Sequence, residues 1–180
     1  MARNIEIKAR IESIEALALS AAALADDGPI EIMQDDTFFR CDAGRLKLRA
    51  FGDGSGELIF YRRADERGPK ESFYVRSPTA APDDLRQALG LAYGEVGRVR
   101  KHRTLFLIGR TRIHLDRVQG LGSFLELEVV LAEDEPAEMG VHEAHTLMNR
   151  LGVDPGDLID QAYVDLINEQ TSKPSANRSY

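Results

Sequence analysis

The sequence has little cysteine, no tryptophan and no long apolar run, and each absence excludes a class of protein. The single cysteine, Cys41, excludes an internal disulfide framework and a zinc site built from several cysteines. The longest apolar runs, such as residues 21–25 and 58–61, are far too short to cross a bilayer. The N-terminal segment MARNIEIKAR lacks the apolar stretch of a signal peptide. We therefore expect a soluble, reduced, cytoplasmic protein that does not bind a membrane.

The overall composition is that of a folded chain. Hydrophobic residues make up 43% of the 180 residues and charged residues 29%, which argues against general disorder. This length suits one domain with a real core, and the sequence shows neither an internal repeat nor an interdomain linker. We predict a single domain over residues 1–170 and a disordered polar tail over residues 171–180.

The net charge of −7 hides an uneven distribution. Residues 40–120 hold 17 of the 23 basic residues but 10 of the 30 acidic ones, so the middle of an acidic chain is basic. This pattern favours a localised anion site over a nucleic-acid surface, and the lack of tryptophan argues against nucleic acid as well. Scattered, solvated charge is the alternative, and the spacing of the charged residues has to decide.

Hairpin-spaced strands dominate the pattern. Residues 4–11 alternate between apolar and polar, as in a strand, and Ser13 then fits the N-cap of a helix that reaches Ala25. Residues 30–33 and 36–41 look like separate short strands. Further helices are predicted from Pro82 to about residue 90, from Pro136 to residue 152, and from Pro155 onward. These elements predict one α+β domain with a largely antiparallel sheet that can close into a barrel.

Charged side chains recur at every second residue along several predicted strands. The sets are Arg45, Lys47 and Arg49; Lys101 and Arg103; Arg110, Arg112, His114 and Asp116; and Glu126 and Glu128. A sheet with one face in water explains the alternation, but it does not explain the sorting by sign. Carboxylates two residues apart can share Mg²⁺ or Mn²⁺, and rows of Arg and Lys bind phosphate oxygens. The pattern therefore also fits a site for a metal-bound polyphosphate.

Several short motifs follow one another between residues 4 and 128. They are NIEIK (4–8), QDDTFF (34–39), RLKLR (45–49), LIFYRR (58–63), KES (70–72), VRKHR (99–103), RIHLD (112–116) and VQGLGSFLELE (118–128). In order and spacing they resemble the CYTH superfamily of triphosphate tunnel metalloenzymes, which includes class IV adenylyl cyclases and thiamine triphosphatases. The first motif resembles the signature E-x-E-x-K, with Asn4 in place of its first glutamate.

The resemblance implies a closed antiparallel barrel of eight strands, with peripheral helices and a triphosphate in its interior. By position, the ligands of Mg²⁺ or Mn²⁺ would be Glu6, Asp116, Glu126 and Glu128. The phosphate-binding residues would be Lys8, Lys47, Arg49, Arg62, Lys70, Lys101, Arg103 and Arg112, where motif position favours Arg62 over Arg63. Asn4 contributes no charge, so we expect one metal ion to bind more weakly.

Charge crowding inside such a barrel suggests candidate roles in catalysis. Lys8 and Lys101 are candidate general bases, because like charges around an ammonium group disfavour its protonation; plain phosphate contacts are the reading we favour. His114 fits either a phosphate contact or a structural histidine.

The implied function is that of a metal-dependent enzyme on nucleoside or organic triphosphates. A class IV adenylyl cyclase, which converts ATP to cyclic AMP and pyrophosphate, is the first choice. A triphosphatase acting on thiamine triphosphate or inorganic triphosphate is the alternative, and a non-catalytic triphosphate or nucleotide binder is a third reading that Asn4 favours. The oligomeric state stays open, a homodimer included.

Overall fold

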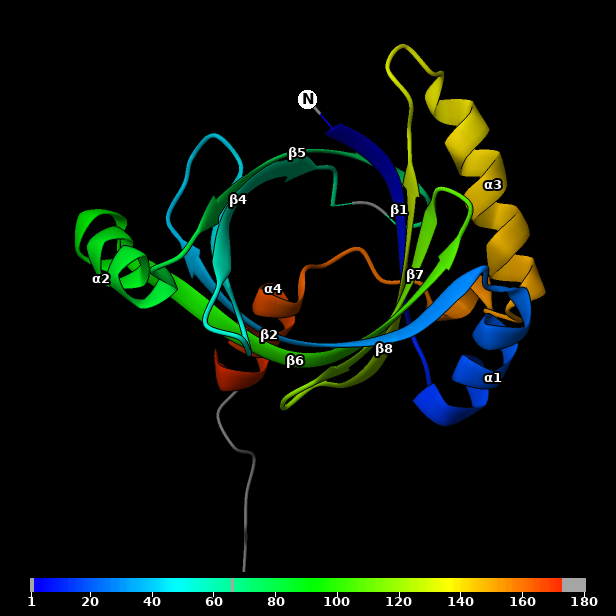
Figure 1. The fold of residues 1–180 in the computed structure, drawn as a ribbon, viewed down its shortest axis with the longest axis horizontal. Helices are drawn as coiled ribbons and strands as arrows, with labels where there is room; N and C mark the ends of the chain where they lie inside the picture. The colour runs from blue at the N-terminus through cyan, green and yellow to red at the C-terminus, as the bar shows by residue number, and fades with distance from the viewer. Residues whose placement is uncertain (1, 66, 173–180) are drawn as a thin grey trace, which may run out of the picture.

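Strands form the largest part of the regular structure in the computed structural model, which describes residues 2–65 and 67–172. They are β1 (Ala2–Arg10), β2 (Asp27–Phe39), β3 (Arg45–Phe51), β4 (Gly56–Arg63), β5 (Lys70–Thr79), β6 (Glu95–Ile108), β7 (Thr111–Val118) and β8 (Gly122–Val130). All neighbouring strands pair antiparallel and close into a barrel in the order β1-β5-β4-β3-β2-β6-β7-β8 (Figure 1). The predicted closed antiparallel barrel is confirmed.

Helices lie around the barrel and across one of its ends. They are α1 (Ile14–Leu24), α2 (Pro82–Tyr93), α3 (Ala137–Arg150), the short 3₁₀ turn η1 (Pro155–Asp157) and α4 (Tyr163–Ser172). Helices α1 and α3 lie outside the wall on one side, and α2 lies on the opposite side (Figure 1). Helix α4 is seen through the barrel at its far end. The Ser13 hydroxyl accepts a hydrogen bond from the Ala16 N–H at 3.2 Å, so the predicted N-cap of α1 is confirmed.

Some predicted boundaries are wrong. Residues 27–39 form one strand and not two pieces, because the pairing with β6 continues without a break through residues 33–36. A shift in register between Asp27 and Ile30 lets the strand begin ahead of the turn signal at Gly28. Helix α2 passes through residue 90 and ends at Tyr93; the next residue, Gly94, has a positive φ of 77°, which glycine adopts most easily.

The last helix also differs from its prediction. Pro155 opens only the turn η1, and α4 begins at Tyr163. Because α4 continues through Ser172, two residues of the predicted tail are helical, while residues 173–180 lie outside the described part of the chain.

The apolar core lies outside the barrel wall and not inside it. Ile7, Ile113 and Leu127 are fully buried between the outer face of the sheet and helices α1 and α3. Burying one such side chain contributes about 1.5–3 kcal/mol, so this layer is the main source of stability on that side. A second apolar cluster surrounds Phe124 and Tyr163 at the α4 end.

The opposite, charged faces of the strands point into the barrel. Lys8, Arg103 and Asp116 are 5%, 4% and 0% exposed, so the charged residues do not form an open solvated face. The fold therefore excludes the interpretation of a sheet with one face in water and is consistent with the interpretation of a binding site inside the barrel. Across residues 2–65 and 67–172, the helices fall short of the length and apolar character needed to span a membrane.

Candidate active site in the barrel interior

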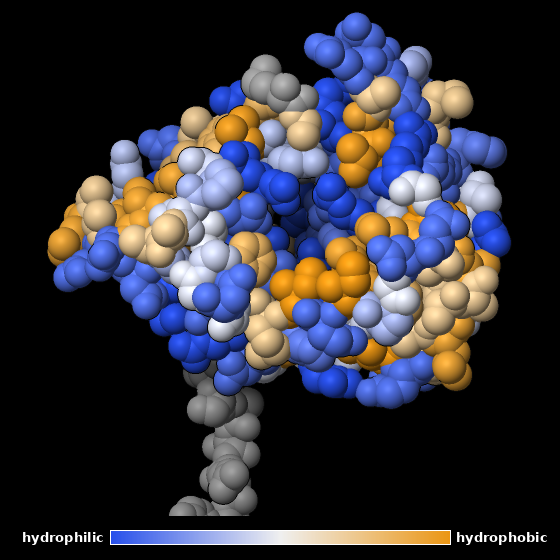
Figure 2. Space-filling view, viewed as in Figure 1, coloured by the Kyte–Doolittle hydropathy of each residue, from blue (hydrophilic) through white to orange (hydrophobic). Residues whose placement is uncertain are grey.

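A cavity of about 320 Å³ lies inside the barrel, and every strand contributes side chains to its lining. In the space-filling view the cavity opens as a hollow bordered by hydrophilic side chains on most of its rim (Figure 2). The far end is covered by α4, from which Ala162 and Tyr163 complete the lining. The barrel is therefore a deep polar pocket reached from the open end.

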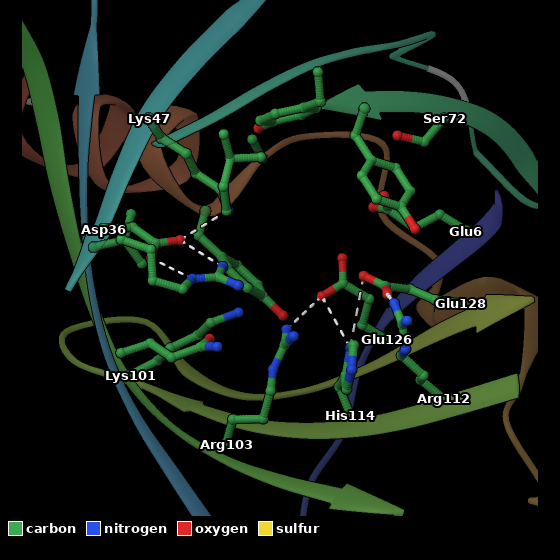
Figure 3. Close-up of a pocket in the computed structure, with 18 of the residues that line it drawn as sticks. Glu6, Asp36, Lys47, Ser72, Lys101, Arg103, Arg112, His114, Glu126 and Glu128 are labelled. Carbon is green, nitrogen blue, oxygen red and sulfur yellow. Dashed lines mark hydrogen bonds and ion pairs between the residues drawn. The ribbon is translucent and has the colours of Figure 1, made fainter. Parts of the chain in front are cut away.

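Basic side chains from several strands converge on this cavity (Figure 3). Those that line it are Lys8, Lys47, Arg49, Arg63, Arg76, Lys101, Arg103 and Arg112. Six of the eight predicted phosphate-binding residues are thus brought together, the exceptions being Arg62 and Lys70. Their shared position in an enclosed site is the arrangement that a polyanion requires.

The preference for Arg62 over Arg63 is wrong. Arg62 is exposed on the outer face, where its Nε donates to the carbonyl oxygen of Ala43 at 2.7 Å. Arg63 lines the cavity and its Nη1 donates to Oε1 of Glu6 at 2.7 Å. The alternation of β4 explains this placement, because Ile59 and Tyr61 also point inward and residue 63 follows in the same phase.

Lys70 is likewise absent from the cavity lining. It is buried, with 4% of its surface exposed, and its Nζ donates to the carbonyl oxygen of Asp160 at 3.2 Å. Lys70 therefore supports the segment that leads into α4, and the structure does not place it with the other predicted phosphate-binding residues.

Asp116 lies beneath the cavity surface, with both carboxylate oxygens already bonded. It accepts hydrogen bonds from Lys101 Nζ at 2.8 Å, from Arg103 Nε and Nη2 at 2.7 and 2.8 Å, and from the Tyr163 hydroxyl at 3.1 Å. Burial raises the pKa of Asp116, but Arg103 and Lys101 outweigh it and hold the pKa far below its usual value. The structure thus separates Asp116 from the other predicted metal ligands and makes it the anchor of two cavity cations.

Two of the predicted ligands, Glu126 and Glu128 on β8, lie beside His114 on β7. His114 Nδ1 is 3.8 Å from Oε2 of Glu126 and 3.8 Å from Oε1 of Glu128. The possible ligand atoms of these three residues all lie within 4.8 Å of one another. Carboxylate oxygens suit a divalent cation such as Mg²⁺ or Mn²⁺, and a neutral imidazole nitrogen can add a ligand to a transition-metal ion, so the residues present fit the metal that the resemblance implies.

The charges of this cluster favour a cation. Burial, followed by the nearby charge of Arg103, lowers the pKa of His114, which leaves its imidazole neutral at physiological pH. Burial raises the pKa of Glu126, but the charges of Lys8 and Arg103 lower it by more than burial raises it, so the carboxylate stays ionised. Glu6 is different: burial and the neighbouring Glu126 raise its pKa. A bound cation would stabilise the ionised form of all three carboxylates.

Glu6 and Asn4 lie on β1 next to this cluster. Lys8 Nζ is 3.6 Å from Glu6 and 3.5 Å from Glu126, and it connects the two carboxylates. Asn4 lines the cavity and is 4% exposed, and within residues 2–65 and 67–172 its Oδ1 accepts no hydrogen bond. A buried amide oxygen without a donor is free to bind a cation or a water molecule.

Sequence reasoning missed three cavity-lining side chains besides Arg63, namely Arg76 on β5, Asp36 on β2 and Tyr163 on α4. Asp36 on β2 accepts from Lys47 Nζ at 2.8 Å and from Arg49 Nε and Nη2 at 2.7 and 2.8 Å. The motif QDDTFF contained this aspartate, but a motif does not show which cations face it. Tyr163 places its ring 4.4 Å from Lys8 Nζ and 5.0 Å from Lys101 Nζ. No strand pattern could reveal this contact, because Tyr163 comes from α4.

The lining of the cavity also has an apolar part. Ile32, Phe51 and Leu105 share it with the charged residues. Figure 2 shows hydrophobic surface directly beside the opening. The cavity can therefore accept a substrate that carries an apolar or aromatic group as well as a polyphosphate.

Comparison with known proteins agrees with this geometry. Adenylate cyclase CyaB of Aeromonas hydrophila is 24% identical over 175 residues, which cover 92% of this chain and 89% of the relative. The PH1012 protein of Pyrococcus horikoshii superposes with a TM-score of 0.80 at 23% identity, covering 91% of this chain and 98% of that one.

A plant protein shares the fold as well. HpAC1 from Hippeastrum, proposed as an adenylyl cyclase and described as having a dominant triphosphatase activity, superposes with a TM-score of 0.62 at 17% identity, covering 95% and 97% of the two chains. The CYTH domain family matches residues 2–163, which is nearly the whole described chain. With the barrel, its inward charges and this match, the chain belongs to the CYTH domain family.

Proposed function

We propose that the protein is a metal-dependent enzyme that acts on a nucleoside or organic triphosphate, with the adenylyl cyclase reaction as the first choice. One observation carries the proposal: a single enclosed cavity holds a ring of cations beside a cluster of two carboxylates and an imidazole. The cations suit the phosphate chain and the cluster suits a divalent metal ion. Phosphoryl chemistry needs this combination of positioning and charge neutralisation more than it needs a covalent intermediate.

The arginines would bind phosphate without giving up their anchors. Arg49 and Arg103 each bind a buried aspartate through Nε and Nη2, which fixes the orientation of the guanidinium group. Arg63 donates to Glu6 through Nη1, while its buried Nε and Nη2 find no acceptor in the described part of the chain. A phosphate oxygen would satisfy these donors, whose burial without a partner is otherwise costly.

In the cyclase reaction the ribose 3′-oxygen attacks the α-phosphorus, and the bond from that phosphorus to the bridging oxygen of pyrophosphate breaks. The proton of the 3′-hydroxyl passes to a base, and pyrophosphate leaves with the bond electrons. A bound Mg²⁺ or Mn²⁺ polarises phosphate oxygens and neutralises developing charge. Lys8 and Lys101 line the cavity, where their ammonium groups would contact phosphate. Burial and Arg103 lower the pKa of Lys101 to about 8, so the fraction of Lys101 that has lost its proton would be the candidate base, and the protonated fraction would bind phosphate.

Two observations favour a cyclase over simple hydrolysis. The cavity has an apolar part that suits a nucleobase, and CyaB is a relative over most of both chains. The triphosphatase alternative is favoured by HpAC1, which shares the fold and is described as mainly a triphosphatase. There the nucleophile is water and the γ-phosphorus is attacked, and the same cations would hold the substrate.

Product analysis separates these reactions. The purified protein is incubated with ATP, inorganic triphosphate and thiamine triphosphate, each with Mg²⁺ or Mn²⁺, and products are resolved by chromatography. Cyclic AMP with pyrophosphate supports the cyclase, and orthophosphate from the γ-position supports the triphosphatase. Metal-dependent binding without any product would overturn the enzymatic proposal and leave a triphosphate binder.

A matched pair of variants ties the activity to the cavity. Glu126→Gln removes one carboxylate charge from the cluster and is expected to abolish metal-dependent turnover. Glu31→Gln removes a carboxylate whose side chain is 52% exposed on the outer face of β2, and it is expected to leave turnover unchanged. Equal turnover in both variants would place the metal elsewhere.

A further inference from the structure

The imidazole of His114 points into the carboxylate cluster without a hydrogen-bonding partner for its Nδ1 atom. The residue is 4% exposed, and no described residue offers Nδ1 a hydrogen bond. Glu126, its direct neighbour across the β7–β8 ladder, and Glu128 each present an oxygen 3.8 Å away (Figure 3). A separation of 3.8 Å is too long for a hydrogen bond, so neither carboxylate satisfies Nδ1 as the side chains lie.

The same separation is natural for ligands of one ion. Ligand atoms that each lie about 2.1 Å from a shared metal are roughly 3–4 Å apart. The two distances from Nδ1, 3.8 Å each, lie within that range, and all the ligand atoms of the group lie within 4.8 Å of one another, so a small inward shift of the side chains would complete the set. The unpaired nitrogen and the two oxygens therefore have the spacing of a ligand set.

We propose that His114 is a nitrogen ligand of the divalent metal, together with Glu126 and Glu128, and that it makes the site select Mn²⁺ over Mg²⁺. Imidazole nitrogen binds first-row transition metal ions well, whereas Mg²⁺ takes oxygen ligands almost exclusively. The identity of the metal rests on the proposed function, which needs a metal in this cluster but is satisfied by either ion. His114 itself is neither an acid nor a base in this proposal.

Binding of the metal alone, without triphosphate, tests the assignment. Mn²⁺ binding is followed through the electron paramagnetic resonance of free Mn²⁺, and Mg²⁺ affinity is obtained by competition. We expect Mn²⁺ to bind at least about tenfold more tightly than Mg²⁺. In His114→Asn, where an amide oxygen replaces the nitrogen, the preference is expected to fall to less than about threefold.

The control is His102→Asn. His102 Nε2 also lies beside a glutamate, 2.9 Å from Glu31, but on the outer face and partly exposed. This variant should keep the wild-type preference for Mn²⁺. An unchanged preference in His114→Asn would overturn the inference.

Pulsed electron paramagnetic resonance of the wild-type protein needs no variant at all. Coupling of bound Mn²⁺ to a ¹⁴N nucleus is expected, and its absence would overturn the inference even if His114→Asn failed to fold. A different pair of results would overturn the proposed function: equal metal binding by Glu126→Gln and wild type, together with no turnover of any triphosphate. If the protein turns over a triphosphate but binds Mn²⁺ and Mg²⁺ equally and shows no nitrogen coupling, the proposed function stands and the role of His114 is rejected.

Discussion

Replacing Asp116 with asparagine distinguishes an anchor of cations from a metal ligand. The carboxylate has 0% of its side chain exposed and receives hydrogen bonds from Lys101, Arg103 and Tyr163. Asparagine keeps the volume but carries no charge, and one of its oxygens becomes an NH₂ group that faces donors. Lys101 then loses its hydrogen-bonded anion, while Arg103 keeps an ion pair only with Glu126, at 2.7 Å.

The expected cost is large because the group is buried. Breaking a buried ion pair by removing one partner costs about 3–5 kcal/mol, since it leaves a buried charge without compensation. For a chain of this length that corresponds to a fall in Tm of roughly 10 °C. Metal affinity, in contrast, should change little, because the carboxylate does not belong to the cluster of His114, Glu126 and Glu128.

The assay combines denaturant unfolding with Mn²⁺ binding on the same preparation. Asp35→Asn is the matched control: Asp35 also accepts from Arg98 Nε and Nη2 at 2.7 Å, but its side chain is 27% exposed on the outer face. A surface pair of this kind is worth about 0–1 kcal/mol, so the control should remain near wild type. Unchanged stability with loss of Mn²⁺ binding in Asp116→Asn would refute the reasoning and return Asp116 to the ligand set.

Three further outcomes are expected. Arg63→Gln should raise the KM for the triphosphate about tenfold, because it removes charge-assisted hydrogen bonds inside the cavity. Arg62→Gln on the outer face should change the KM less than about twofold. Equal effects of the two variants in steady-state kinetics would contradict the placement of these side chains on β4. Affinity for a non-hydrolysable triphosphate should fall as pH rises above about 8, because burial and Arg103 lower the pKa of Lys101 to about 8 and phosphate binds the protonated lysine. Calorimetry at several pH values should show a weaker pH dependence in Lys101→Met. A pH dependence in that variant equal to that of wild type would count against the assignment. Gly97→Ala should destabilise the protein by about 1–3 kcal/mol, because a Cβ there would lie 2.5 Å from Val164 Cγ2 and push α4 away from β6. An unchanged Tm in thermal unfolding would show that α4 moves aside without cost.

Periodicity predicted which side chains share a face, but not what that face encloses. The alternation of Lys47 and Arg49, or of Glu126 and Glu128, is equally consistent with a solvated sheet. Closure of the sheet depends on pairing between β1 and β8, residues separated by most of the chain, and nothing local to either strand specifies it. The motifs that resemble the CYTH superfamily supplied that information, and the structure confirms the barrel they implied.

The errors within the site have separate physical causes. Motif position placed Arg62 inside, although strand alternation puts it out of phase with the inward Ile59 and Tyr61. Asp116 is in phase with His114, so alternation was right about its direction. What alternation could not show is that Lys101, Arg103 and the α4 residue Tyr163 surround it and leave no oxygen free. Contacts made from another element are the ones that a strand pattern cannot contain.

The distribution of the core explains how the fold tolerates such an interior. Buried ion pairs are poor sources of stability, because desolvation cancels most of their attraction. A barrel of this size could be filled with apolar side chains at lower cost. Here the stabilising apolar layer, with Ile7, Ile113 and Leu127, lies instead between the outer wall and helices α1 and α3. Because that layer holds the wall in shape, the interior can keep cations and carboxylates oriented toward a shared cavity, where a triphosphate and a metal ion would compensate them. The cost of burying these charges is therefore best understood as a requirement of binding and not of folding.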